Sequence, residues 1–222
     1  MRVFAALAGM TGWVALALQF YLSAVNGSAR GLPAGEMVLR YFSFFTILTN
    51  MLVALVLTQA VLAPGRGILG RPAVQAATAG YIAVVGLIYV VILRHTWAPT
   101  GLQWWVDVAL HYAMPLLYLA FWLAFAAKGR LRWAMPLGWL AYPGLYLAWV
   151  LARGAASGFY PYPFIDVARL GYGRMAANAL GMMLLFLLVG FAFVALDRLL
   201  ARGRALTPTS ADPDRRAHRR RA

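Results

Sequence analysis

Apolar residues fill six long stretches of the chain, and short polar connections separate them. A helix that crosses a bilayer needs about 20 mostly apolar residues, because the hydrocarbon core is roughly 30 Å thick. Backbone polar groups in lipid must also be satisfied within the segment, which favours helices. The pattern therefore predicts an all-α polytopic membrane bundle of six transmembrane helices. The predicted spans are Val3–Ala24, Met37–Ala63, Ala73–Leu93, Leu102–Ala127, Trp133–Leu151 and Tyr172–Leu200.

The predicted spans account for residues 1–202, which we expect to form one six-helix transmembrane domain. The connections between them are rich in glycine and proline, the residues of turns. The first apolar stretch is longer than the roughly 7–15 residues of a signal-peptide core, so we expect a retained span. Residues 203–222 are polar and rich in Arg and Asp, which predicts a basic, disordered tail.

Composition supports a membrane protein and excludes several other classes. Hydrophobic residues make up 63% of the 222 residues, and charged residues only 12%. Soluble domains carry roughly 25% charged residues, and a domain of this size has too much surface to cover with so few polar groups. The absence of cysteine excludes disulfides, a thiol nucleophile and a cysteine metal site.

The formal net charge of +14 is concentrated in the C-terminal tail and in the connections. Positive residues flanking membrane helices accumulate on the cytoplasmic side, and the bias here predicts that both termini are cytoplasmic. We expect the basic tail to contact anionic lipid headgroups. The charge is not accompanied by a nucleic-acid-binding motif that combines aromatic and basic residues, so nucleic acid is not an expected partner. The Arg- and Ala-rich composition is typical of a bacterial protein, which indicates the bacterial plasma membrane.

Polar side chains inside a membrane helix are costly and often functional. In the second predicted span Ser43, Thr46 and Asn50 recur at helical spacing and share one face. In the fourth, Asp107 and His111 are four residues apart and also share a face. A carboxylate one turn from an imidazole can orient its tautomer and stabilise its charged form.

Depth along the helices places these two faces at the same level. Both predicted spans enter from the outer side, and with a rise of about 1.5 Å per residue Ser43 lies ~9 Å and His111 ~13 Å along its helix. A hydroxyl nucleophile needs a base within hydrogen-bond reach. Ser43 or Thr46 with His111 as base and Asp107 as its partner is therefore a candidate catalytic group.

The fifth connection, residues 157–166, is also on the outer side and contains Tyr160-Pro161-Tyr162-Pro163. We expect Tyr160, Tyr162 and Asp166 to cap a substrate pocket, with Asn50, Tyr160 or Tyr162 as donors to a developing oxyanion. Structural interpretations stay open for the same residues. Ser and Thr in membrane helices commonly bond their own i−4 carbonyl, and a segment with two prolines forms a rigid loop.

Cofactor chemistry has little support in the sequence. Membrane haem needs facing histidine ligands, and only His95 and His111 lie near the spans. A zinc site needs three or four ligands, which His111 and Asp107 would supply only with His95 or Asp166. We therefore expect no cofactor and no metal.

Three segments together resemble a known family. They are the run Tyr41-Phe42-Ser43-Phe44-Phe45-Thr46-Ile47-Leu48-Thr49-Asn50, the segment Leu110-His111-Tyr112, and the run from Tyr160 to Asp166. In order and spacing they resemble the androgen-induced-gene and androgen-dependent TFPI-regulating protein family and its bacterial six-span relatives. The resemblance covers most of the chain from Met37 to Leu200.

The resemblance implies a function. Characterised animal members are multipass hydrolases of fatty acid esters of hydroxy fatty acids, with an intramembrane threonine nucleophile and a histidine. A gapless match places the nucleophile at Ser43 and the histidine at His111. This chain departs from the animal pattern, since serine replaces threonine, and Thr46 one turn deeper is the alternative nucleophile.

Two other classes of function remain open at this point. A small transporter would use the same outer polar cluster to bind its solute, and a non-enzymatic membrane protein would use it for packing. Transport sites lie near the midplane, often at broken helices. The predicted cluster lies shallower, and neither span has a proline or glycine break just at Ser43 or His111, although Pro115 is expected to kink the fourth. The sequence does not indicate an oligomeric state.

Overall fold

The computed structural model describes residues 1–206, and in that part of the chain all regular structure is helical. Six segments are long and apolar enough to cross a membrane, which confirms the predicted all-α six-span bundle. They are Arg2–Ala29, Phe45–Leu62, Pro72–His95, Gly101–Phe125, Met135–Ser157 and Val167–Gly203. The chain is therefore built as an integral membrane protein. The predicted tail lies, from residue 207 onward, outside the described residues.

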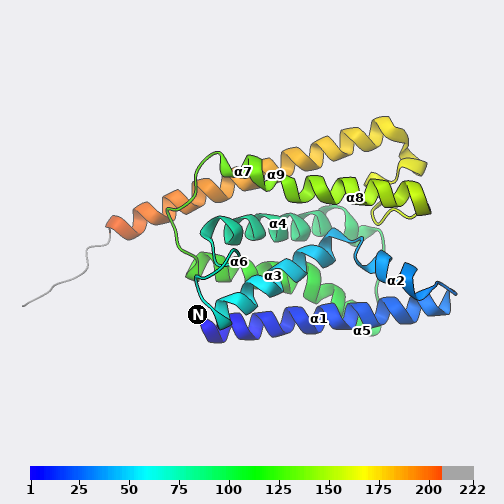
Figure 1. The fold of residues 1–222 in the computed structure, drawn as a ribbon, viewed down its shortest axis with the longest axis horizontal. Helices are drawn as coiled ribbons and strands as arrows, with labels where there is room; N and C mark the ends of the chain where they lie inside the picture. Colours follow the sequence, from blue (N-terminus) through cyan, green and yellow to red (C-terminus); the bar gives the residue numbers. More distant parts are fainter. Residues whose placement is uncertain (207–222) are drawn as a thin grey trace, which may run out of the picture.

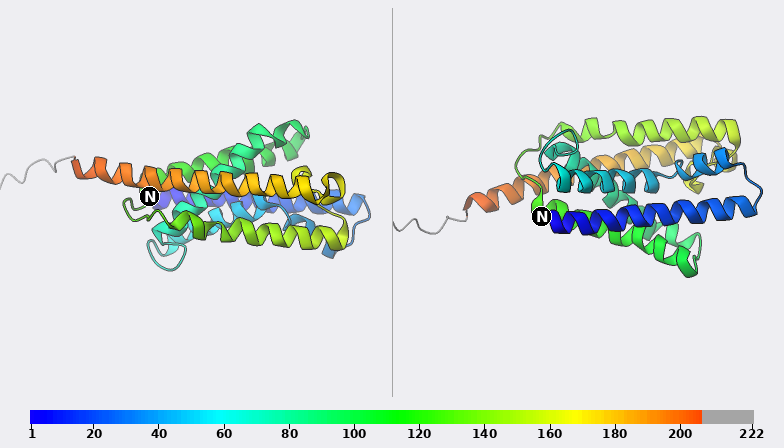
Figure 2. Two further views of the ribbon diagram at one scale, coloured as in Figure 1. Left: turned by 90° about the horizontal axis from the view of Figure 1, so that it is seen from above. Right: turned by 60° about the horizontal axis from the view of Figure 1, so that its bottom comes forward.

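The helices run up and down between two ends of the bundle (Figure 1). We call the end where the chain begins the proximal end and the opposite one the distal end. α1 (Arg2–Ala29) and α4 (Pro72–Val91) finish at the distal end, where α3 (Phe45–Leu62) starts. Figure 1 shows α8 (Ala141–Ser157) and α9 (Val167–Leu206) along one side of the bundle and α1 along the opposite side, with α3, α4 and α6 (Met114–Phe125) between them. α9 extends past the other helices at the proximal end (Figure 2).

The second span is interrupted, and the prediction of one continuous helix from Met37 to Ala63 is wrong. α2 (Ala34–Tyr41) ends three residues before α3 begins at Phe45. At the break the Ser43 N–H turns to the Arg40 carbonyl at 3.1 Å instead of continuing the helical ladder to Leu39. Ser43 therefore lies in the connection, and Thr46 lies in the first turn of α3.

The fourth span is also irregular. α5 (Gly101–Val108) passes into a π-helical turn, η2 (Ala109–Ala113), before α6 begins at Met114. Pro115 has no N–H and its ring clashes with the carbonyl of the preceding turn, so a regular α-helix cannot pass through this point. The Met114 N–H instead bonds the Ala109 carbonyl, five residues back. The expected kink thus takes the form of a widened turn that contains His111.

The last two spans carry smaller irregularities. The fifth begins with the short α7 (Met135–Trp139) before α8, and α9 is kinked at Gly171, where φ is 72° and ψ 162°. Glycine tolerates this left-handed φ because it has no Cβ. Two 3-10 turns, η1 (Leu93–His95) and η3 (Pro163–Ile165), lie at the distal end.

The proximal half of the bundle is closely filled by large side chains of α6, where Tyr118, Phe121 and Trp122 are buried. α1 approaches this core closely because it presents small residues. A Cβ at Gly12 would lie 2.8 Å from Met114 Cε, so a larger residue there would require the end of the Met114 side chain to move. Small residues at such contacts let membrane helices pack by van der Waals contact.

Candidate functional site

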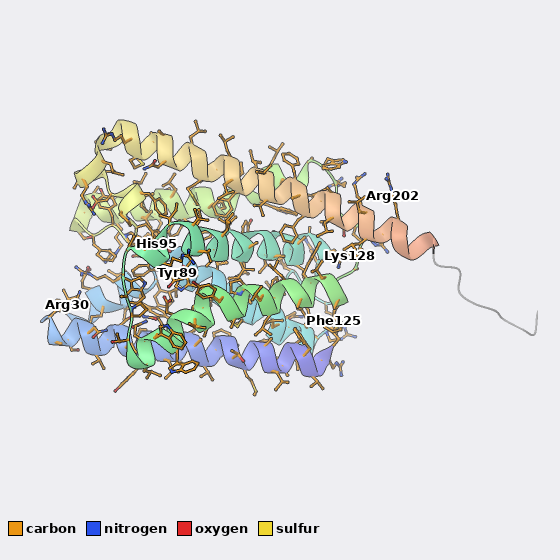
Figure 3. The ribbon with its side chains drawn as sticks, turned by 180° about the vertical axis from the view of Figure 1, so that it is seen from behind. Arg30, Tyr89, His95, Phe125, Lys128 and Arg202 are labelled. Atoms are coloured by element: carbon orange, nitrogen blue, oxygen red, sulfur yellow. The ribbon has the colours of Figure 1, made fainter. Side chains whose placement is uncertain are left out.

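A cavity of about 440 Å³ opens in the distal half of the bundle. Side chains from α1 to α5, from the π-helical turn and from the 159–163 segment form its wall. Figure 3 shows Tyr89 near the end of the bundle that holds Arg30, whereas Phe125, Lys128 and Arg202 lie toward the other end. The polar members of its lining include Gln19, Ser23, Arg30, Arg40, Tyr41, Thr46, Tyr89, Gln103, Asp107, His111 and Tyr162.

Asp107, His111 and Tyr89 form one connected group in this wall. His111 Nδ1 lies 3.1 Å from Asp107 Oδ1 and 3.1 Å from the Asp107 carbonyl oxygen. Only the carbonyl contact has hydrogen-bond geometry, so the carboxylate acts on the ring through its charge. Tyr89 donates its hydroxyl proton to Asp107 Oδ2, and its ring stacks on the His111 ring with centroids 4.0 Å apart. The predicted Asp–His pair is thus in contact and holds one face of the imidazole in place.

The close approach of α4 to the π-helical turn allows this stacking. A Cβ at Gly86 would lie 3.4 Å from the His111 carbonyl oxygen and 3.3 Å from Pro115 Cβ. Glycine at this position lets α4 lie against the turn, and Tyr89 follows three residues later on α4. π-helical turns inside α-helices are frequent at functional sites.

Thr46 lines the same cavity from the first turn of α3. Its backbone N–H donates to the Tyr162 hydroxyl at 3.3 Å, and its Oγ1 lies 3.4 Å from the same oxygen. Burial raises the pKa of Tyr162, so that hydroxyl keeps its proton and remains a donor. The N-terminus of α3 carries the positive end of the helix dipole, which favours negative charge near Thr46.

Ser43 has a different environment, although it is only three residues away. Its side chain is fully buried and it is not among the residues that line the cavity. Its Oγ donates to the Leu39 carbonyl at 2.6 Å, which replaces the bond lost where α2 ends. Its own carbonyl accepts a proton from Tyr146 at 2.8 Å. Ser43 therefore stabilises the break, and the structural interpretation of this serine fits its contacts.

Asn50 lies one turn deeper on α3 and joins the two irregular spans. Its Nδ2 donates to the Thr46 carbonyl at 2.9 Å and to the Leu110 carbonyl at 3.2 Å. One amide thus fixes the carbonyl of Thr46 beside the residue that precedes His111. Asn50 is fully buried and is not among the residues that line the cavity.

Two further predicted pocket residues lie outside the cavity wall. Asp166 Oδ1 accepts the Arg169 N–H at 3.2 Å, the hydrogen bond of an N-cap at the start of α9. The Tyr160 ring packs against Gly154, where a Cβ would lie 2.1 Å from Tyr160 Cε1. Of the three expected cap residues, only Tyr162 lines the cavity.

At the rim of the cavity, charged residues connect α2 to α8. Glu36 Oε1 on α2 accepts from Arg40 at 2.6 Å and from Arg153 of α8 at 2.9 Å. The Phe159 ring lies against both guanidinium groups: its centroid is 4.5 Å from Arg40 Cζ and 4.9 Å from Arg153 Cζ. The hydrogen bond from Arg40, and then that from Arg153, lowers the pKa of the Glu36 carboxyl below its ordinary value. These contacts hold α2 against α8.

Tyr89 is the main site residue that the sequence did not single out. It belongs to the third span, and its partners come from α5 and the π-helical turn. The available signal was weak: a tyrosine near the distal end of a membrane helix, at a depth similar to that of Asp107. Tyrosine in such a position is usually read as an interfacial residue.

Within residues 1–206, no group of three or more His, Asp or Glu side chains is placed to hold a metal ion. A scan against models of protein families and searches of curated proteins and of solved structures found no match. The site is therefore interpreted from its own geometry.

Proposed function

We propose that this protein is an intramembrane hydrolase of lipid esters, such as fatty acid esters of hydroxy fatty acids. The observation that carries the proposal is that a hydroxyl, an imidazole and a buried carboxylate line one membrane-embedded cavity. Thr46 is the nucleophile, His111 the general base and Asp107 the residue that positions the imidazole. We choose Thr46 over Ser43 because Thr46 lines the cavity, whereas the Ser43 hydroxyl already donates to a backbone carbonyl.

The reaction proceeds in two steps. His111 Nδ1 faces Asp107, so Nε2 takes the Thr46 proton as Oγ1 attacks the ester carbonyl. The alcohol leaves with the proton returned by Nε2, and an acyl-threonine remains. Water then attacks the acyl carbon while Nε2 takes its proton; the bond to Thr46 Oγ1 breaks as Nε2 returns that proton to Oγ1, and the fatty acid leaves.

Tyr162 and the first turn of α3 stabilise the oxyanion in this mechanism. The Tyr162 hydroxyl lies 3.4 Å from Thr46 Oγ1, and its raised pKa keeps the proton that it would donate to the oxyanion. Preorganised donors at such a position typically contribute about 10²–10³ in rate. Tyr89 holds Asp107 from the other side and stacks on the His111 ring, so it positions the base.

The family resemblance and the membrane orientation belong to the same proposal. We place the chain with the androgen-induced-gene and androgen-dependent TFPI-regulating family and its bacterial relatives, in the bacterial plasma membrane with both termini cytoplasmic. The arginines and lysines of the connections support this orientation. The cavity then faces the outer leaflet, where lipid esters enter between helices.

Hydrolysis of a panel of lipid esters by the purified full-length protein in detergent tests the proposal. We expect Thr46→Ala and His111→Ala to reduce turnover about 10³-fold or more, and Thr46→Ser to restore part of it. Thr49→Ala is the matched control, since Thr49 lies one turn deeper on α3 and does not line this cavity. Full turnover in Thr46→Ala would exclude the mechanism.

A second candidate function is transport of a small polar solute. The observation that favours it is the interruption between α2 and α3, because broken helices are typical of transporter sites. Solute flux into liposomes that is driven by the wild-type protein and persists in Thr46→Ala would favour transport. Ester hydrolysis that depends on Thr46 would favour the enzyme.

A further inference from the structure

The distal half of α1 carries a stripe of polar residues that the proposed mechanism does not use. The stripe consists of Gln19, Ser23, Asn26 and Arg30. Their spacing of four, three and four residues places them on one face of the helix, and all four line the cavity of the candidate site. Eleven residues separate Gln19 from Arg30, so the stripe runs for roughly 16 Å along the cavity. Polar side chains in a membrane helix are costly and often functional, which makes this stripe a candidate for ligand contact.

The two ends of the stripe differ in their hydrogen bonds. At the inner end Gln19 donates to Ser23 Oγ at 3.2 Å and accepts from Gln103 of α5 at 2.8 Å, which connects α1 to α5. At the distal end, where Figure 3 shows Arg30, no other described side chain or backbone group pairs with the Arg30 guanidinium or with the Asn26 amide. Both groups line the cavity, so a ligand can bind to them.

The charge on the distal wall of the cavity is positive. Arg30 and Arg40 line the cavity, and Asp107 is the one carboxylate in its described lining. Glu36 pairs with Arg40 and also with Arg153, so one carboxylate there faces two guanidinium groups. The Arg30 charge has no such counter-charge. A cavity lined by an excess of one sign of charge concentrates ligands of the opposite sign.

We propose that the distal end of α1 binds an acidic group of the ligand that occupies the cavity, with Arg30 pairing to a carboxylate or phosphate and Asn26 donating to one of its oxygens. The planar guanidinium group matches the geometry of both acids. The cavity of about 440 Å³ is within the roughly 300–1,000 Å³ of small-molecule sites, so the rest of the ligand has space beside the stripe. The inference concerns the charge of the ligand, and it applies to an ester substrate and to a transported solute alike.

A single introduced thiol tests the charge of the cavity, because the chain has no cysteine of its own. Ser23→Cys places the thiol on the stripe, about two turns or roughly 10 Å from Arg30. The probes are two methanethiosulfonate reagents of similar size, the anionic ethylsulfonate and the cationic ethyltrimethylammonium compound. Their rates with the full-length protein in phosphatidylcholine nanodiscs, each divided by the rate with 2-mercaptoethanol, give the charge preference at the thiol.

We expect the anionic reagent to be preferred at Ser23→Cys, and Arg30→Gln to lower that preference about three- to tenfold, the effect of one charge at this distance on two oppositely charged probes. Arg94→Gln is the matched control, since Arg94 is an exposed arginine at the same end of the bundle but does not line the cavity. Arg30→Lys should keep the preference. An unchanged preference in Arg30→Gln, an equal fall in Arg94→Gln, or no modification by either reagent would overturn the inference.

Protection of the same thiol identifies the acidic group. Laurate and dodecyl phosphate share one chain and differ in the acid, and dodecanol is the uncharged control. We expect at least one acid to slow the reaction of Ser23→Cys with neutral methyl methanethiosulfonate, and Arg30→Gln to weaken that protection about fivefold or more. Protection by one acid alone assigns a carboxylate or a phosphate site, and protection by both assigns a general acid site. Equal protection by dodecanol, or none by either acid, would contradict the assignment.

The outcome is separable from that of the proposed reaction, because neither measurement uses turnover. Charge preference at Ser23→Cys without any ester hydrolysis would support the acidic-group site and reject only the hydrolase. Thr46-dependent hydrolysis without that preference would reject only the acidic-group site. Arg30 is exposed, so its replacement should leave the thermal midpoint of the protein unchanged, which serves as the control for folding.

Discussion

Two buried carboxylates lie at opposite ends of the bundle and have opposite kinds of partner. Asp197, near the proximal end of α9, is fully buried and accepts the backbone N–H groups of Gly129 and Leu131 at 3.0 and 3.1 Å. Asp107, at the distal end, is 3% exposed and is held by a tyrosine hydroxyl and an imidazole. Burial is nearly equal, so burial alone does not separate a carboxylate that binds the backbone from one that we propose acts in catalysis.

The difference lies in what surrounds each carboxylate. Asp197 satisfies main-chain donors of a connection between helices, which fixes the path of the backbone. Asp107 contacts the side chains of Tyr89 and His111, both of which can exchange protons, and it lines the cavity. For a carboxylate in a membrane helix, two features therefore indicate its role: which groups donate hydrogen bonds to it, and whether a ligand can reach those groups.

Replacement of Asp107 should have the largest effect. Asp107→Asn removes the charge that positions and stabilises the His111 imidazolium but keeps the shape of the side chain. We expect ester turnover to fall about 10²–10⁴-fold, the range of general acid–base contributions. Steady-state hydrolysis measures this, with the thermal midpoint in detergent as the control for folding. Turnover within threefold of wild type would remove Asp107 from the mechanism.

Replacement of Asp197 should affect stability and leave the chemistry intact. Asp197→Ala leaves the Gly129 and Leu131 N–H groups without their acceptor, which should destabilise the protein by about 2–4 kcal/mol. Thermal unfolding in detergent measures this loss. The folded fraction should retain wild-type turnover, and a selective loss of turnover would erase the contrast between the two acids.

Removal of the Tyr89 hydroxyl should have a smaller effect at the distal site. Tyr89→Phe keeps the ring that stacks on His111 but deletes the hydrogen bond to Asp107. We expect about a tenfold loss of turnover with an unchanged KM, because a charged hydrogen bond contributes about 1.5–3 kcal/mol and water replaces part of it. Tyr112→Phe, whose ring lies edge-on to Tyr89, is the matched control. Equal effects of the two variants would indicate general packing.

Glu36 at the rim is a third, more exposed carboxylate and should have the smallest effect. Its pKa is lowered from the ordinary 4.5, so its contribution to stability is complete above about pH 4.5 and is lost as the pH falls through the lowered value. Near neutral pH we expect the free energy of unfolding of wild type to exceed that of Glu36→Gln by about 0.2–1 kcal/mol. Thermal unfolding of both proteins against pH measures the difference, which should disappear under strongly acidic conditions. A difference that grows on acidification would contradict the assigned sign.

The sequence predicted the six spans because hydropathy reports directly on them, and it predicted the contact between Asp107 and His111 because their spacing is local. It did not predict the break at Ser43, because no proline or glycine lies there. At the break the Ser43 hydroxyl, instead of the Ser43 N–H, donates to the Leu39 carbonyl. In the proposed mechanism that break favours Thr46 over Ser43, since it leaves Ser43 bonded to the backbone and Thr46 on the cavity wall.

Other site features depended on tertiary contacts that local patterns do not contain. Tyr89 meets Asp107 only because α4 and α5 are neighbours, and Gly86 permits the approach. Asp166 was interpreted as a pocket residue, but its position directly before α9 makes it a helix cap. The widened turn at His111 was foreshadowed by Pro115, although its π-helical form was not.

Mapping of a fluorophosphonate adduct on the wild-type protein tests the central claim most directly. The probe forms a stable bond with an activated hydroxyl, and mass spectrometry locates it. The account predicts a single adduct on Thr46 that persists in Ser43→Ala and disappears in Thr46→Ala and His111→Ala. An adduct on Ser43, or labelling that is independent of His111, would contradict the assignment of Thr46 and His111 as nucleophile and base.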